Sequence, residues 1–344
     1  MYTFVQVGPG CKLTASDGAS GDAFGTSCAI DGDTILIGAK YDGDKGLKSG
    51  SAYVFVRSGT TWTQQQKLTA SDGAAGDWFG ISVDLDGETA VIGATPDNGE
   101  GSHSGSAYVF VRSGLTWSQY QKLVPSDGAE ADEFGLSVAL DGNTILIGAP
   151  KADAWLGATW NGWKRGSAYV FARDGTTWSL QQKLTPNDGE QYDYDDYDGM
   201  MYYFGTSVAL DGNTILIGVP GSNLNQPGAS FARTGSVHVF FRSGTTWSLQ
   251  QNRLTANDAE SWDYFGSSVA FDSHTFFVGA PSKQSINSTI GSVYSYEKYA
   301  FPSPPPPPPP HPSPPPAFTA CASGSILTGL LGLISATVVA FVIV

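Results

Sequence analysis

Two stretches of the sequence combine side-chain types that suit ligand binding. One holds three tryptophans followed by a lysine and an arginine, and the other holds four aspartates among tyrosines. Aromatic rings stack on sugars or protein surfaces at a low entropy cost, and carboxylates bind hydroxyl groups or cations. We therefore predict a ligand site built from Trp155, Trp160, Trp163, Asp193, Asp195, Asp196 and Asp198.

The acidic stretch from Asp193 to Asp198 also looks like a calcium loop, although its third ligand and its glycine, Gly199, come one place late. Calcium takes six to eight oxygen ligands, and such loops supply several of them. Calcium at residues 193–198 is therefore one interpretation of the acidic residues. The other is a solvated face without a ligand, because runs of like charge are commonly just soluble surface.

The sequence offers little for catalysis. Its four histidines stand alone, and none is spaced with cysteine or glutamate as a metal site requires. They are His103, His238, His274 and His311. No nucleophile elbow, phosphate loop or zinc helix is present, so we expect a binding protein without a cofactor rather than an enzyme. A glycan-active enzyme that uses two surface carboxylates stays open as the weaker alternative.

Five copies of one sequence unit organise the chain up to residue 299. The copies repeat in steps of 55 to 70 residues, and each opens with a Phe-Gly pair. These pairs begin at Phe24, Phe79, Phe134, Phe204 and Phe265. Self-similarity of this length is typical of repeat architectures, in which each unit buries its apolar face against its neighbours.

Within each copy, apolar residues alternate with polar ones over four short segments bounded by Gly, Asp or Ser, which predicts four antiparallel strands. Asp-Gly pairs such as Asp86-Gly87 predict tight hairpins, with positive φ expected at both central residues. Four-stranded sheets repeated radially make a β-propeller, so the predicted fold is all-β. Two further sets recur in phase, and we expect blade packing from the first and turn hydrogen bonds from the second. They are Trp62, Trp117, Trp178 and Trp247, then Asp22, Asp77, Asp132 and Asp263.

The Phe-Gly pairs, the endings Gly148-Ala149-Pro150 and Gly279-Ala280-Pro281, and the strands between them resemble the FG-GAP repeat proteins. This family includes the β-propeller heads of integrin α subunits. The resemblance implies a propeller over residues 1–299 with an extracellular role in adhesion or recognition. Integrin propellers carry a calcium loop between the first two strands, but this chain has only short turns there, so the resemblance brings no calcium to those positions.

The ends of the repeat region leave the closure of the ring open. The fifth copy stops at Tyr299 without a fourth strand, while an orphan copy of the strand-ending segment lies at Lys12–Gly18. Residues 2–14 could therefore supply the outer strand of the last blade and close a five-bladed ring. The alternative is a larger ring of up to seven blades, as is common in the family. Cys28 takes the place of a strand valine, so we expect a small buried side chain there, with a disulfide to Cys11 as the alternative.

Composition narrows the range of partners. The formal net charge is −14, and charged residues make up only 15% of the chain. A strongly acidic surface repels phosphates, so nucleic acid and anionic lipid surfaces are disfavoured as partners. The 43 glycines fit an all-β domain with many turns.

Residues 300–318 form a proline-rich linker. Such a tract adopts extended polyproline II, in which fifteen residues reach roughly 45 Å. Its Ser-Pro character resembles the hydroxyproline-rich glycoproteins of plant and algal walls. We expect a stalk, and the alternative is a ligand for proline-binding domains.

Residues 319–344 read as a membrane anchor. The run from Ile326 to Val344 has no charge, and as a helix it would reach about 29 Å. It is either a single transmembrane helix or a signal that is replaced by a glycolipid anchor. Cys321 beside it is a candidate for palmitoylation, and the sequon at Asn287 is a candidate for glycosylation, which favours an extracellular propeller. Insertion of the tail after synthesis would instead leave the propeller in the cytosol.

We therefore expect a membrane-anchored protein of the cell surface, in the plasma membrane with its propeller outside. It would bind a glycan or protein ligand in adhesion. The binding face would carry the loops from strand two to three and from strand four to the next blade, because the long insertions fall there. The alternative is a wall-associated structural glycoprotein without a discrete ligand.

Overall fold

A computed structural model gives the structure of the chain over ten ranges. They are residues 12–95, 104–152, 165–186, 202–222, 233–250, 253–272, 274–282, 284–285, 288–289 and 291–298. The elements in these ranges are β-strands. None of the described residues belongs to a helix long and apolar enough to cross a membrane. The proline-rich linker at 300–318 and the apolar run at 326–344 lie outside the described ranges.

Four antiparallel sheets of four strands follow one another along the chain. The first two are β1 (Phe24–Asp31), β2 (Thr34–Ala39), β3 (Ser51–Ser58), β4 (Thr61–Leu68), β5 (Ser82–Asp86), β6 (Thr89–Ala94), β7 (Ser106–Ser113) and β8 (Thr116–Leu123). The next two are β9 (Ser137–Asp141), β10 (Thr144–Ala149), β11 (Ser167–Asp174), β12 (Thr177–Leu184), β13 (Val208–Asp211), β14 (Thr214–Val219), β15 (Ser236–Ser243) and β16 (Thr246–Leu249).

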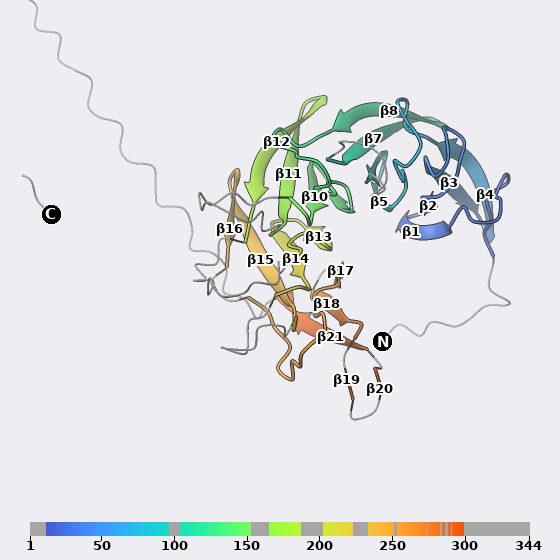
Figure 1. Ribbon diagram of the computed structural model, residues 1–344. Coiled ribbons are helices and arrows are strands. Elements are labelled where there is room, and N and C mark those ends of the chain that lie inside the picture. Colours follow the sequence, from blue (N-terminus) through green and yellow to red (C-terminus); the bar gives the residue numbers. More distant parts are fainter. Residues whose placement is uncertain are drawn as a thin grey trace, which may run out of the picture. The chain divides into compact units, whose positions relative to one another are not determined.

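The fifth blade has three strands among the described residues, β17 (Ser268–Asp272), β18 (Thr275–Ala280) and β21 (Ser292–Glu297). A small hairpin, β19 (Gln284–Ser285) with β20 (Ser288–Thr289), lies between the last two. Figure 1 shows the sheets side by side along a curve, with β1, β5, β13 and β17 on the inner side and β4, β8, β12 and β16 on the outer side. The predicted all-β propeller of five blades is confirmed.

The hairpin turns differ in detail from the prediction. Asp31 pairs with Thr34, so the loop residues are Gly32 and Asp33 rather than Asp31 and Gly32. The φ angle of Gly32 is 53°, whereas Asp33 has a negative φ. Positive φ at only the first central residue is the pattern of a type II′ turn, which places glycine there. The aspartate of each Asp-Gly pair is therefore the last residue of its strand.

Blades pack face to face through alternating residues. Leu36 of the first blade is fully buried, and it belongs to one apolar cluster with Ile92 and Trp117 of the second blade. Equivalent clusters join the second blade to the third, the third to the fourth and the fourth to the fifth. Trp117, Trp178 and Trp247 are each 2% exposed, which confirms their predicted role in blade packing. Trp62 is only half-buried, because no blade among the described residues packs on that face of the first blade.

The Phe-Gly pair and the Gly-Ala ending meet at each boundary between blades. Phe79 is fully buried, and its ring meets Tyr108 edge to face at 5.5 Å. At the next boundary, a Cβ atom on Gly93 would lie 2.0 Å from the carbonyl oxygen of Gly135, so only glycine fits. The Ser82 hydroxyl donates a hydrogen bond of 2.8 Å to that same carbonyl. The Phe-Gly pair and the Gly-Ala ending therefore form the close contact that joins neighbouring blades.

The two ends of the row of blades carry exposed apolar residues. Ile30 on the first blade is 64% exposed, and on the fifth blade Phe277 and Val293 are 41% and 72% exposed. Leu13 and Ala15 pack on the first blade, on the face that turns away from the second. Leu68 and Ala70, at and just after the end of β4, pack on the second blade in the same way. The place of Leu13 and Ala15 is thus the one expected after a fourth strand, and residues 2–11, the rest of the expected strand, lie outside the described ranges.

Cys28 lies on the same end of the row and is an exposed free cysteine. The expectation of a buried side chain was wrong because it rested on the valines of later blades, each of which faces a preceding blade. Cys11, the alternative disulfide partner, lies outside the described ranges.

Candidate functional site

The connections between strands two and three and the linkers between blades lie side by side, as the sequence predicted. The amide of Gly76 in the linker donates to the carbonyl oxygen of Leu47 at 3.0 Å, and the amide of Trp78 donates to that of Lys48 at 3.2 Å. The same contact recurs at the last boundary, where the amide of Tyr264 donates to the carbonyl oxygen of Arg233 at 3.2 Å. We call the surface formed by these segments the loop face.

Linker aspartates shape this face. The carboxylate of Asp77 accepts a hydrogen bond of 2.7 Å from the amide of Ala74, which closes a turn. Asp22, Asp132 and Asp263 make the same bond to the residue three positions earlier. The prediction that these aspartates form turns is confirmed.

The residue before each Phe-Gly pair has a left-handed backbone. Its φ lies between 51° and 60° in every blade, at Ala23, Trp78, Glu133, Tyr203 and Tyr264. Such a φ is uncommon for residues other than glycine and is a real outlier for bulky ones. Because all five blades share it, the fold imposes the conformation. The side chain at this position then decides what each boundary between blades presents on the loop face.

At the boundary of the first and second blades, this position begins an aromatic and cationic cluster. The rings of Trp78 and Tyr41 meet edge to face at 5.6 Å. The Lys40 ammonium lies 4.9 Å from the centre of the Tyr41 ring and 5.3 Å from that of Trp78. The Lys48 ammonium lies 5.3 Å from the Tyr41 ring. We call Lys40, Tyr41, Lys48 and Trp78 the first corner.

At the boundary of the fourth and fifth blades, equivalent backbone positions form a second cluster. The ring of Trp262 lies 6.2 Å from that of Tyr264, and the Arg233 guanidinium lies 5.3 Å from the Trp262 ring. Trp262 is 40% exposed. Arg233 occupies the place of Lys48, two residues before the glycine that leads into the third strand. We call Arg233, Trp262 and Tyr264 the second corner.

The boundary of the second and third blades is built differently. Glu133 replaces the aromatic residue, and its carboxylate pairs with the Lys151 ammonium at 2.7 Å. Lys151 occupies the place of Tyr41, since the amides of both residues donate to the equivalent linker carbonyl at 3.1 Å. Lys151, however, lies in the blade that follows Glu133, whereas Tyr41 lies in the blade that precedes Trp78, so the ion pair and the aromatic cluster join different pairs of repeat positions.

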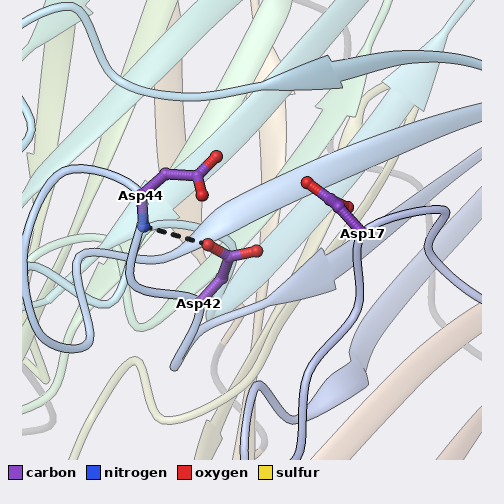
Figure 2. Close-up of side chains that lie close together, drawn as sticks. All are labelled: Asp17, Asp42 and Asp44. Atoms are coloured by element: carbon purple, nitrogen blue, oxygen red, sulfur yellow. Dashed lines mark hydrogen bonds between the residues drawn. The ribbon is translucent and has the colours of Figure 1, made fainter.

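An acidic cluster that the sequence did not reveal lies beside the first corner. Figure 2 shows the carboxylates of Asp17, Asp42 and Asp44 close together, with the Asp44 amide donating to Asp42 at 3.1 Å. Oxygens so close together are able to hold a metal ion. The Lys67 ammonium, however, lies 2.7, 2.9 and 2.5 Å from the three carboxylates. This lysine already supplies the cation, so the cluster is an ion-pair network.

The pKa shifts in this network keep both Lys67 and Asp42 charged. Burial disfavours the Lys67 ammonium, but its hydrogen bonds to the three aspartates outweigh burial and raise the pKa of Lys67. Burial acts against the Asp42 carboxylate as well, yet hydrogen bonds from the Tyr53 hydroxyl and Lys67 lower its pKa. The Tyr53 hydroxyl donates to Asp42 at 2.6 Å. The network therefore persists across neutral pH.

The network varies a motif that later blades repeat in simpler form. A linker aspartate pairs with a lysine of the fourth strand beside a tyrosine of the third, as in Asp127, Lys183 and Tyr169. In the fourth blade the tyrosine is replaced by His238, which is 1% exposed. Burial, followed by the charge of Arg253, lowers the pKa of His238 to about 3, so its imidazole is neutral. This histidine belongs to blade packing.

The residues predicted to bind ligand lie outside the described ranges. These are Trp155, Trp160, Trp163, Asp193, Asp195, Asp196 and Asp198, with the calcium interpretation of residues 193–198. The modification candidates Asn287 and Cys321 also lie outside them. One insertion joins β10 to β11 and the other joins β12 to β13, which are the two kinds of connection whose described members form the loop face.

Both corners were missed by sequence reasoning because each joins residues of two different blades. A signal was present in the register of the repeats. The residue two places before the glycine ahead of the third strand is a lysine, histidine or arginine in four copies, at Lys48, His103, Lys164 and Arg233. Aligning that position with the residue before Phe-Gly would have pointed to basic residues beside aromatic ones.

A comparison with protein families identifies the repeats. The model of the FG-GAP repeat matches five times, at residues 11–55, 62–110, 117–171, 178–240 and 247–296. The matches cover most of the chain, so it belongs to the FG-GAP repeat family. Each match begins at or near a fourth strand and ends in the third strand of the next blade. By this pattern, the segment at residues 12–18 corresponds to the end of a fourth strand and the linker that follows it. No curated protein matches the chain.

Proposed function

We propose that this protein is a cell-surface adhesion or recognition protein that binds a glycan or protein ligand on its loop face. The observation that carries the proposal is the difference between the two ends of the blades. Among the described residues, one end has two-residue turns such as Gly32-Asp33, while at the other end the described parts of the longer connections are joined by backbone hydrogen bonds. Binding residues are commonly placed on loops held by a rigid scaffold.

Family membership supports binding over catalysis. FG-GAP propellers are typically non-enzymatic, and the fold suggests a ligand-binding or adhesion role in general. We infer that the two long insertions extend the loop face and that Trp155, Trp160 and Trp163 take part in binding. The acidic residues from Asp193 to Asp198 would contact the ligand directly or hold calcium beside it.

We further propose that the propeller is held at the outer surface of the plasma membrane. The support is compositional: a proline-rich stalk, an uncharged apolar run at Ile326–Val344 and a sequon at Asn287. The run would act as a transmembrane helix or be exchanged for a glycolipid, and Cys321 would carry a palmitate in the first case. The stalk would hold the loop face away from the bilayer.

The location is tested by labelling intact cells that express the full chain with a biotin reagent that does not cross membranes. Labelling is expected, and a phospholipase that cleaves glycolipid anchors then separates the two anchors by releasing the protein or leaving it. Protein that is labelled only after lysis would contradict an outside propeller.

Binding is tested by retention of these cells on immobilised polysaccharides and glycoproteins. Replacing Trp155, Trp160 and Trp163 with alanine should reduce retention without changing the thermal unfolding midpoint. Leu115→Ala is the matched control, because Leu115 is 80% exposed in the short turn between β7 and β8, away from the loop face. Equal retention of cells with and without the protein would support the alternative, a structural glycoprotein without a ligand.

A further inference from the structure

We propose that the first and second corners are binding sites for anionic sugars, so that the ligand of the loop face is an acidic polysaccharide. The inference deepens the proposed function and rests on it. It follows from three observations on the described residues: the two corners share two equivalent backbone positions, each combines a cation with aromatic rings, and the boundary of the second and third blades, at Glu133 and Lys151, lacks that combination.

The equivalence of the corners is geometric. In both, a basic residue lies near the end of the connection from strand two to strand three. Its carbonyl oxygen accepts a hydrogen bond from the amide of the aromatic residue before Phe-Gly. Lys48 and Trp78 have φ of 57° and 51°, and Arg233 and Tyr264 have φ of 33° and 55°. The frame thus holds a basic residue and an aromatic residue at the same two backbone positions at both boundaries, while the ring that each of these cations contacts is Tyr41 at one corner and Trp262 at the other.

The side chains at each corner match the parts of an acidic sugar. A carboxylate or sulfate group pairs with an ammonium or guanidinium, and a guanidinium presents two parallel donors to it. The apolar face of the sugar ring stacks on an aromatic side chain. Trp262 at 40% exposure offers such a surface beside Arg233. The cation held near an aromatic ring is already placed, which reduces the entropy lost on binding.

The charge of the whole chain does not prevent binding at the corners. A net charge of −14 repels polyanions at long range, but salt screens exposed charges beyond about 8 Å at physiological ionic strength. The charges within that distance then determine whether an anion binds. Lys40 makes no ion pair among the described residues, and the three carboxylates beside the first corner pair with Lys67. The Lys40 ammonium is therefore available to an anionic group.

Two corners on one face favour a polymer over a single sugar. A chain that reaches both corners gains affinity because its second contact is intramolecular, which raises overall affinity by about 10² to 10⁴. A monosaccharide would bind weakly and a long acidic polymer tightly. The proposal thus predicts a steep dependence on ligand length as well as on charge.

The test measures binding of the full chain to three linear polymers of matched length: a polygalacturonate, a sulfated galactan and a neutral glucan. The charge-removing variants are K40Q/K48Q for the first corner and R233Q for the second. Their charge-keeping partners are K40R/K48R and R233K. The matched control is E133Q/K151Q, which removes charges at the boundary without an aromatic cluster. Thermal unfolding of each variant verifies that it folds.

We expect binding to at least one acidic polymer, weakened by salt, and none to the neutral glucan. Each charge-removing variant should weaken binding about tenfold or more, while the charge-keeping variants and the control stay within about twofold. Preference for polygalacturonate or for the sulfated galactan identifies the anionic group. Equal binding of the neutral glucan, no binding of either acidic polymer, or an equal loss in E133Q/K151Q would overturn the inference. Cells retained on neutral polysaccharides or glycoproteins would then still support the proposed function.

Discussion

The inner boundaries between blades and the two end faces of the row use the same repeat positions, yet only the inner ones are covered. Leu146 of the third blade is fully buried against the fourth, whereas Phe277, its equivalent in the fifth, is 41% exposed. The Ser137 hydroxyl donates to Gly205 of the next blade, and Ser268 has no such bond among the described residues. Every blade therefore carries the apolar residues that would pack on a following blade, whether or not one is present among the described residues.

The strongest test of this comparison uses the glycines at the end of the second strand of each blade. A Cβ atom on Gly148 would lie 2.1 Å from the carbonyl oxygen of Gly205 in the next blade, while on Gly279 it would meet only the movable Ser268 hydroxyl, at 2.3 Å. We expect Gly148→Ala to lower the free energy of unfolding by more than about 3 kcal/mol and Gly279→Ala by less than about 1 kcal/mol. Urea unfolding measures both, and equal losses would contradict the account.

A second pair tests burial itself. Leu146→Ala should cost about 3 kcal/mol, because it opens a cavity between blades. Phe277→Ala should cost clearly less, since its side chain is partly in water. The midpoints of denaturant unfolding give the comparison. A loss at Phe277 as large as that at Leu146 would mean that the end face is covered in solution.

A third test concerns a carboxylate placed inside an inner boundary. Asp84 stands where other blades have alanine, and it accepts from the amide of Leu140 in the next blade at 2.7 Å. Burial, together with the charges of Asp86 and Asp141, raises its pKa to about 6 despite that bond. The folded state therefore holds the proton more tightly than the unfolded chain, and this contribution to stability is lost as pH rises from about 4 through 6.

Asp84→Asn keeps the acceptor oxygen and removes the ionisation. The variant should be more stable than the parent at pH 7.5, on the order of 2 kcal/mol, and similar to it at pH 4. Thermal unfolding midpoints measured from pH 4 to 8 check this, with all other titrating groups common to both proteins. A difference that does not change with pH would show that the pKa of Asp84 is the same in the folded and unfolded states.

The smallest expected effect is at the serines. Ser137→Ala removes a hydrogen bond of 2.9 Å between blades and should cost about 1 kcal/mol. Ser268→Ala should change the free energy of unfolding by less than half as much. A cost at Ser268 equal to that at Ser137 would indicate that it has a partner in solution.

Much of the fold was readable from the sequence because it is set by local patterns that recur in phase. Alternation gave the strands, and the repeated tryptophans and linker aspartates have the roles expected of them, as Trp117 and Asp77 show. The sequence could not show which repeat faces stay uncovered, since Cys28 and the buried valines of later blades look alike in one dimension. The corners were equally hidden, because Lys48 and Trp78 come from different repeats and meet only when blades pack.

The central claim is that the loop face is the binding face, and amide hydrogen exchange of the full chain with and without polygalacturonate tests it most directly. The account predicts slower exchange in residues 40–48, 76–79 and 260–265 when the polymer is bound. It predicts no change in the short turns at residues 32–33, 87–88 and 142–143 at the other end of the blades. Protection of those turns, or protection of neither set by any polymer that binds the protein, would contradict the account.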